Sequence, residues 1–325
     1  MDACDFLSID KPVLQGAMGG VARHDLVVAV SKSGGLGTVS YLPPQMFADE
    51  MKQVEQSLSG TTFAANLLLP VITDVHVKAC LDSSVPIVTL FYGFDQKIVS
   101  ALKDAGKIVL FQVGSLDEAK RVIAAGADGV IAQGYEAGGH IRGKKRLSDL
   151  LSEIRSAFPQ HLVCGAGGIH DGASADACRN LGADAVASGT RFLATPEAAA
   201  HPAYKQRLVE AAETVATNLF GVGWRDPHRV VPNEAVKKWC KPDGREPSWL
   251  SLVHAMTRVV AKLSSSDGSA ALTAKQSLGR PLYTPASLSP EMPAEMIEVV
   301  AVYAGECVRD INDIRPARQI VEELA

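Results

Sequence analysis

The segment Ser115-Leu116-Asp117-Glu118-Ala119-Lys120-Arg121-Val122-Ile123-Ala124-Ala125-Gly126-Ala127-Asp128-Gly129-Val130 contains a complete helix-to-strand unit. Ser115 is a helix N-cap residue, an amphipathic stretch follows it, and Gly126 ends the predicted helix. The turn Gly126-Ala127-Asp128 then leads into a strand. The same turn recurs at Gly182-Ala183-Asp184, after a second helix predicted over Ser174–Leu181. A unit that repeats in this way indicates alternating helices and parallel strands.

On both sides of this unit, β-rich runs recur with starts 21 to 32 residues apart. That spacing fits a strand, a loop and a helix, repeated. Several runs are apolar throughout, which is typical of strands buried on both faces. The runs are Pro12–Leu14, Leu36–Ser40, Thr62–Leu68, Pro86–Tyr92, Lys107–Val113, Gly129–Gln133, His161–Cys164 and Asp184–Ala187. Eight parallel strands covered by helices predict an α/β fold, a (β/α)8 TIM barrel.

An open, doubly wound sheet is the competing architecture. It would normally carry Gly-x-Gly-x-x-Gly after its first strand. The first strand here runs instead into Gln15-Gly16-Ala17-Met18-Gly19-Gly20, which does not have that spacing. The barrel is therefore the favoured prediction.

The pattern changes after residue 190, where helical, proline-rich and charged stretches replace the regular units. We expect residues 1–219 to form the cofactor-binding barrel and residues 220–300 to form a mainly helical insertion over the barrel mouth. A helix over Leu250–Leu263 belongs to that insertion. Residues 301–325 contain an amphipathic helix, Pro316–Leu324, that is expected to return to the barrel as its eighth helix.

Composition narrows the class of protein. Hydrophobic residues make up 47% and charged residues 21% of the 325 residues, which is typical of a globular protein. The net charge of −4 does not favour binding to nucleic acid. No apolar run approaches the ~20 residues of a membrane span, and the first residues lack a secretory pattern.

The six cysteines are scattered without a Cys-x-x-Cys pair, and no two histidines are four residues apart. We therefore expect a cytoplasmic enzyme without nucleic-acid or membrane partners and without a metal site. Its oligomeric state is not indicated.

Two glycine-rich loops follow the seventh and eighth predicted strands: Gly165-Ala166-Gly167-Gly168-Ile169 and Ser188-Gly189-Thr190-Arg191-Phe192. Barrels that bind phosphate commonly use these two loops. Glycines let backbone N–H groups approach an anion closely, and the Thr190 hydroxyl adds a donor. Each loop alone would more often be a tight turn, but the pair predicts a phosphate site.

Polar residues at other strand ends point to the same face of the barrel. Asn66, Gln112 and Gln133 lie at or near the ends of predicted strands, and their amides could offer hydrogen bonds to a planar ring. The segment Gln133-Gly134-Tyr135-Glu136-Ala137-Gly138-Gly139-His140 follows the sixth strand. His140 is the candidate general base, with a pKa near ~6.5 and a short, mobile tether. Glu136 is expected to brace this loop by accepting backbone hydrogen bonds.

These motifs resemble the nitronate monooxygenases, which are FMN-dependent barrel enzymes. The resemblance includes Pro12–Met18, Phe63–Leu67, Gln133–His140, Gly165–Ile169 and Gly189–Phe192, and near the end of the chain Tyr303–Glu306 and Ile314–Ala317. The Glu-Ala-Gly-Gly-His segment is fairly specific, whereas the glycine pairs alone are not.

The resemblance implies an FMN cofactor and a small-molecule substrate that is oxidised by O2. The flavin phosphate would lie on Gly167, Gly168, Gly189 and Thr190. The ring system would contact Ala17, Met18, Asn66, Gln112 and Gln133, and Gly138 and Ser188 would also bind the cofactor. His140 would face the substrate, a nitronate or a nitroalkane, which would give a carbonyl compound and nitrite. Some relatives place a lysine at the position of Gln112, so this chain lacks that charge.

Other functions are also compatible with these motifs. Flavin-dependent enoyl-acyl-carrier-protein reductases and NADH:quinone reductases share the fold and the histidine-bearing loop. A barrel that acts on a sugar phosphate is one alternative, but it would require a catalytic lysine or paired carboxylates at strand ends, which the sequence does not show. A protein that keeps flavin without catalysis is a further alternative.

Overall fold

The computed structural model describes residues 2–222, 224, 226–250, 253–254 and 272–325. An eight-stranded parallel sheet forms its larger lobe, in the order β1-β9-β8-β6-β5-β4-β3-β2. The strands are β1 (Val13–Gln15), β2 (Thr38–Val39), β3 (Ala64–Leu68), β4 (Ile87–Phe91), β5 (Ile108–Val113), β6 (Gly129–Gln133), β8 (Leu162–Ala166) and β9 (Ala185–Ser188). A parallel bridge between Leu14 and Leu36 closes the sheet. The predicted TIM barrel is confirmed.

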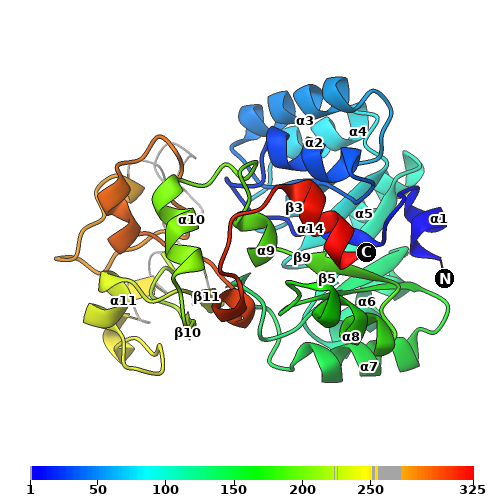
Figure 1. Ribbon diagram of the computed structural model, residues 1–325. Coiled ribbons are helices and arrows are strands. Elements are labelled where there is room, and N and C mark those ends of the chain that lie inside the picture. The colour runs from blue at the N-terminus through cyan, green and yellow to red at the C-terminus, as the bar shows by residue number, and fades with distance from the viewer. Residues whose placement is uncertain (1, 223, 225, 251–252, 255–271) are drawn as a thin grey trace.

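Helices cover the outside of the barrel (Figure 1). They are α2 (His24–Lys32), α3 (Pro44–Leu58), α4 (Asp74–Asp82), α5 (Gln96–Asp104), α6 (Leu116–Ala124), α7 (Leu147–Ala157) and α8 (Gly172–Asn180). The short α9 (Thr190–Leu193) follows β9 at the barrel mouth. In α6 the Ser115 hydroxyl accepts a hydrogen bond from the N–H of Glu118 at 3.2 Å, as the sequence predicts for an N-cap. Gly126 adopts φ = +99°, the left-handed conformation that ends such a helix.

The last helix of the chain, α14 (Ala317–Leu324), packs against α2, α8 and α9. It therefore occupies the place between the helix after β8 and the helix after β1. Its four apolar residues Ala317, Ile320, Val321 and Leu324 are completely buried in the layer between strands and helices. The wall of the barrel thus includes a segment far from β9 in sequence.

The inside of the barrel is filled by one apolar residue or more from each strand or strand approach. Ala3 and Leu7 of α1 (Ala3–Leu7) join this cluster and close the end at which the strands begin. The end at which the strands finish is left to carry the site.

A second lobe lies beside the barrel mouth (Figure 1). It contains α10 (Pro202–Val209), α11 (Glu234–Trp239), the 3-10 helices η1 (Ala294–Glu298) and η2 (Glu306–Asp310), and a three-stranded antiparallel sheet. That sheet has the order β10 (Val215–Thr217), β11 (His228–Val230) and β7 (Gly139–His140). The sequence did not predict this sheet, and the lobe takes in α10 and β10, which precede the expected boundary at residue 220. Most of the helix expected over Leu250–Leu263 lies outside the described residues.

Within the described part of the chain, a search for helices that are long and apolar enough to cross a membrane finds none.

Candidate functional site

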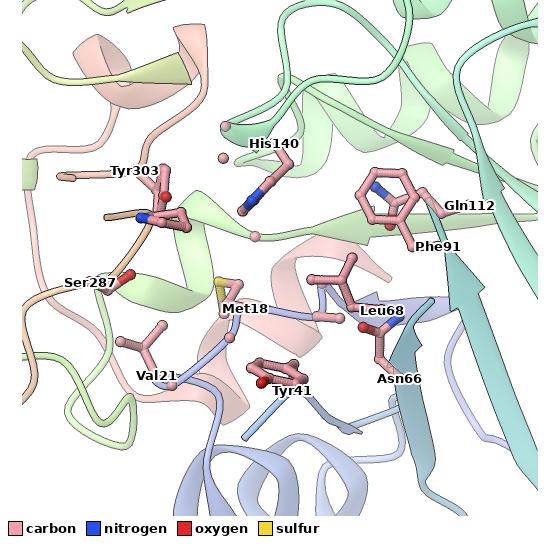
Figure 2. Close-up of a pocket in the computed structure, with 18 of the residues that line it drawn as sticks. Met18, Val21, Tyr41, Asn66, Leu68, Phe91, Gln112, His140, Ser287 and Tyr303 are labelled. Carbon is pink, nitrogen blue, oxygen red and sulfur yellow. The ribbon is translucent and has the colours of Figure 1, made fainter. Parts of the chain in front are cut away.

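A cavity of about 1350 Å³ opens between the barrel mouth and the second lobe (Figure 2). Its barrel side is formed by strand ends and the loops after them, and residues between Val222 and Tyr303 form its other side. The volume exceeds the roughly 300–1,000 Å³ of ordinary ligand pockets, so a cofactor and a substrate fit together. All of the site residues predicted from the sequence line it: Ala17, Met18, Asn66, Gln112, Gln133, Gly138, His140, Gly167, Gly168, Ser188, Gly189 and Thr190.

The loops after β8 and β9 form a cradle of backbone at one side of this cavity. Gly167 and Gly168 adopt φ of +125° and +75°, conformations that a residue with a Cβ rarely takes. Among the described residues, the N–H groups of Gly167, Gly168 and Gly189 find no hydrogen-bond acceptor. The Ser188 hydroxyl donates to the carbonyl of Ile169 at 2.7 Å and so ties the two loops together. Backbone N–H groups that are free to donate, and that no side chain shields, can bind the oxygens of a phosphate.

The amides at the strand ends have different environments. The Nδ2 of Asn66 donates to Thr89 Oγ1 at 2.9 Å, which leaves the Asn66 oxygen for a ligand. Gln133 uses both ends of its amide on the next loop, donating to the carbonyl of His140 at 2.8 Å and accepting from the N–H of Arg142 at 3.1 Å. Gln112 lies on the same wall, near Phe91 in Figure 2.

The loop that carries His140 is held on several sides. Besides the two bonds from Gln133, the N–H of Ile141 donates to the carbonyl of Pro227 at 2.9 Å. The Tyr92 hydroxyl donates to the carbonyl of Ile141 at 3.1 Å. Glu136 accepts from the N–H of Leu147 at 3.0 Å, which confirms its expected bracing role. The expectation of a mobile tether for His140 is wrong, because these bonds fix the backbone from His140 to Arg142 and the pairing of Gly139 with Arg229 fixes it on the other side.

The imidazole of His140 faces the cavity and is surrounded by aromatic rings. Its centroid lies 4.3 Å from that of His228 and 4.4 Å from that of Trp224. Its Nε2 has no hydrogen-bond partner within the described chain. Burial lowers the pKa of His140 to about 3, since the cationic ring would lose its hydration without gaining a counter-ion. The expected pKa near ~6.5 is therefore corrected, and the ring is neutral at physiological pH.

His228 was not singled out from the sequence. It lies directly opposite His140 in the antiparallel pairing of β7 and β11, and side chains at such positions share a face of the sheet. It is completely buried, and its Nδ1 lies 3.0 Å from the hydroxyl of Tyr303. Burial lowers the pKa of His228 and raises the pKa of Tyr303, so both groups are neutral. Three-residue strands carry no periodicity, so the sequence could not reveal this pairing.

Tyr92 is a second residue that sequence reasoning did not assign to the site. It follows β4, lines the cavity, and holds φ = +60°, a strained conformation for a bulky side chain. Its ring meets the His140 ring edge-on at 5.8 Å. A signal was present, because Tyr92 is the last residue of a predicted strand, the position at which a barrel places its functional side chains.

The electrostatics of the cavity are unusual for a phosphate site. Among the described residues that line it there is no lysine or arginine, and the carboxylate is that of Asp226, which Arg142 meets at 3.3 Å. No group of three or more potential metal ligands occurs in the described chain. Anions entering the cavity therefore depend on neutral hydrogen-bond donors.

Comparison with known proteins agrees with this geometry. The sequence profile of the nitronate monooxygenase family matches residues 2–74 and 69–325. The chain belongs to the nitronate monooxygenase family. It is thus an oxidoreductase of a flavin-dependent kind.

Two solved structures resemble this family member closely. FabK from Thermotoga maritima is 30% identical with a TM-score of 0.77, over 99% of this chain and 93% of that one. A nitroalkane oxidase from Streptomyces ansochromogenes is 28% identical with a TM-score of 0.76, over 100% of this chain and 96% of that one.

Among curated relatives, the chain is 32% identical over 243 residues to a (3aS,4S,5R,7aS)-5-hydroxy-7a-methyl-1-oxo-octahydro-1H-indene-4-carboxyl-CoA dehydrogenase of Mycobacterium tuberculosis. The match covers 72% of this chain and 66% of that protein, just under two thirds of its length.

Proposed function

We propose that this protein uses FMN to oxidise alkyl nitronates with O2, giving a carbonyl compound and nitrite. The observation that carries the proposal is the convergence of the glycine cradle, the strand-end amides and the neutral imidazole of His140 on one cavity. The family to which the chain belongs and the nitroalkane oxidase likeness support it.

In this proposal the FMN phosphate is held by the N–H groups of Gly167, Gly168 and Gly189, with Ser188 and Thr190 bracing the cradle. The flavin ring lies along the wall formed by Ala17, Met18, Asn66, Gln112, Gln133 and Gly138. The close approach of Gly138 to Gly305, whose N would lie 2.5 Å from an added Cβ, accounts for the glycine there. When bound, the flavin supplies the electron acceptor.

The state of His140 favours a nitronate over a neutral nitroalkane. A general base works best when its pKa lies near the operating pH. The pKa of His140 is about 3, so the ring is a weak base toward a C–H proton. A nitronate has already lost that proton, and a neutral imidazole can orient it or exclude water beside it. We therefore assign His140 to binding and orientation of an anionic substrate.

A reductase acting on an acyl thioester is the second candidate. The size and apolar character of the cavity favour it, since Pro43, Pro70 and Val71 extend the lining well beyond the strand ends. The carboxyl-CoA dehydrogenase among the similar proteins points in the same direction, because its name gives a CoA compound as its substrate.

One experiment separates the two. The purified protein is expected to be yellow, to release FMN on heating, and to consume O2 when propyl-2-nitronate is added. Oxidation of NADH that depends on crotonyl-CoA, without O2 uptake from nitronate, would assign the protein to the reductases. Release of FAD, or of no flavin, would contradict the cofactor assignment.

A further inference from the structure

Tyr303 and His228 lie beside His140 and form a hydrogen-bonded pair that has no role in the proposed function described above. Tyr303 lines the cavity, and its ring lies 5.8 Å from the ring of His140 (Figure 2). His228 does not line the cavity and has no exposed surface, so it can act only through its neighbours. Its Nδ1 is 3.0 Å from the Tyr303 hydroxyl, and either atom could donate in that hydrogen bond.

The other nitrogen of His228 decides which atom donates. Nε2 is buried and has no partner among the described residues. If Nε2 carried the ring proton, a buried N–H donor would be orphaned, and orphaned donors are rarer in proteins than acceptors with a free lone pair. With the proton on Nδ1 instead, His228 donates to the Tyr303 oxygen. The hydroxyl of Tyr303 then does not donate to His228, and its proton can point into the cavity.

The cavity needs such a donor. A nitronate spreads its negative charge over two oxygens, and no lysine or arginine stands among the described lining residues to meet it. A hydrogen bond from a neutral hydroxyl to a charged oxygen is stronger than one between neutral groups. Tyr303 approaches from the wall that also presents His140, so the two side chains can contact the same substrate group.

We propose that His228 directs the hydroxyl of Tyr303 to donate a hydrogen bond to a nitronate oxygen, which makes Tyr303 a determinant of substrate binding. His228 is the positioning residue in this pair. The proposal rests on the proposed function and deepens it, since it names the recognition of an oxygen-bearing anion by a tyrosine and a neutral histidine.

The first test uses variants of the flavin-loaded enzyme. Tyr303→Phe and His228→Phe should each raise the KM for propyl-2-nitronate by about 10- to 100-fold, the worth of a hydrogen bond to a charged group, and retain FMN. The double variant should be no worse than either single one, because both remove the same interaction. His228→Asn should restore most of the loss, since an amide N–H can replace the Nδ1 donor.

Tyr283→Phe is the matched control. It also removes the hydroxyl of a buried tyrosine, which donates to the carbonyl of Ser277 at 3.0 Å away from the cavity. Its KM should be unchanged. A merely structural role for the pair would lower stability and flavin content without a selective rise in KM, and Asn would not rescue it. An unchanged KM in Tyr303→Phe would overturn the proposal.

The second test does not depend on turnover. Long-range ¹H–¹⁵N correlation spectra of histidine-labelled protein, assigned with His228→Asn, should show the proton of His228 on Nδ1. A proton on Nε2 would refute the pair whatever the activity. If the wild type oxidised no nitronate, the proposed function would fail by itself. Binding of propyl-2-nitronate, followed by the flavin absorbance, must then still be weaker in Tyr303→Phe than in the wild type for the pair to stand.

Discussion

At the scale of single residues, the site is governed by what surrounds each polar atom. Burial keeps both His140 and His228 neutral. The carboxylate among the described lining residues is that of Asp226, and it pairs with Arg142 rather than with either histidine. A histidine is usually the group that titrates near neutral pH. Here its environment removes that property and leaves an aromatic ring with one donor and one acceptor.

A pH profile follows from this. Because the pKa of His140 is about 3, the ring gains no proton between pH 5.5 and 8.5. We expect kcat/KM for freshly prepared nitronate to show no inflection near pH 6.5, and we expect turnover of the parent nitroalkane to be much slower than that of the nitronate at every pH. Steady-state O2 consumption measures both. An inflection near 6.5 that disappears in His140→Asn would show that the ring titrates and acts as a base.

The sequence could identify those site residues whose position along a single strand already places them at the barrel mouth. Asn66 lies in the middle of β3, and Gln112 and Gln133 lie in the last two positions of β5 and β6. Parallel strands bring these parts together at the mouth of a barrel. His228 and Tyr303 reach the site through the pairing of short segments far apart in the chain, which no local pattern encodes. Their burial and their partner could be learned only from the folded molecule.

At the scale of elements, the loops after β8 and β9 differ from the sheet β10-β11-β7 in how well they could be predicted. The loops follow strands of four or five residues with a strong apolar pattern, and their glycines stand out. The strands β7, β10 and β11 have two or three residues, too few for a period of two to be recognised. The sequence therefore predicts a mainly helical insertion and does not reveal its sheet.

The start of α9 allows a direct test of the phosphate cradle. A Cβ on Gly189 would find space, since its nearest contact is Met18 Sδ at 3.7 Å, and both residues line the cavity. Gly189→Val should therefore fold and yield protein with little or no flavin, as read from the visible spectrum after purification. Gly279→Val is the control, because its Cβ also meets only a 3.8 Å contact and the residue does not line the cavity. Full flavin content in Gly189→Val would place the phosphate elsewhere.

At the scale of the whole molecule, the barrel depends on a helix that follows the second lobe in the chain. Ile320 of α14 is completely buried between strands and helices, so Ile320→Ala should cost about 2–5 kcal/mol in the free energy of unfolding. Glu322→Ala on the exposed side of the same helix, where the carboxylate meets Arg318, should change it by no more than about 0.5 kcal/mol. Urea unfolding of the two variants provides the comparison. Equal, small effects would mean that α14 is not part of the barrel wall.

The position of α14 also has a consequence for synthesis of the protein. The strand β9 ends at Ser188 and α14 begins at Ala317, so the ribosome makes the whole second lobe between them. At ordinary rates of about 5–20 residues per second, this delay is on the order of ten seconds. During that time the seam between α8 and α2 lacks its cover, and the apolar residues of β1 and β9 face water or a chaperone. A nascent chain stalled in the second lobe would therefore expose a barrel with one open side.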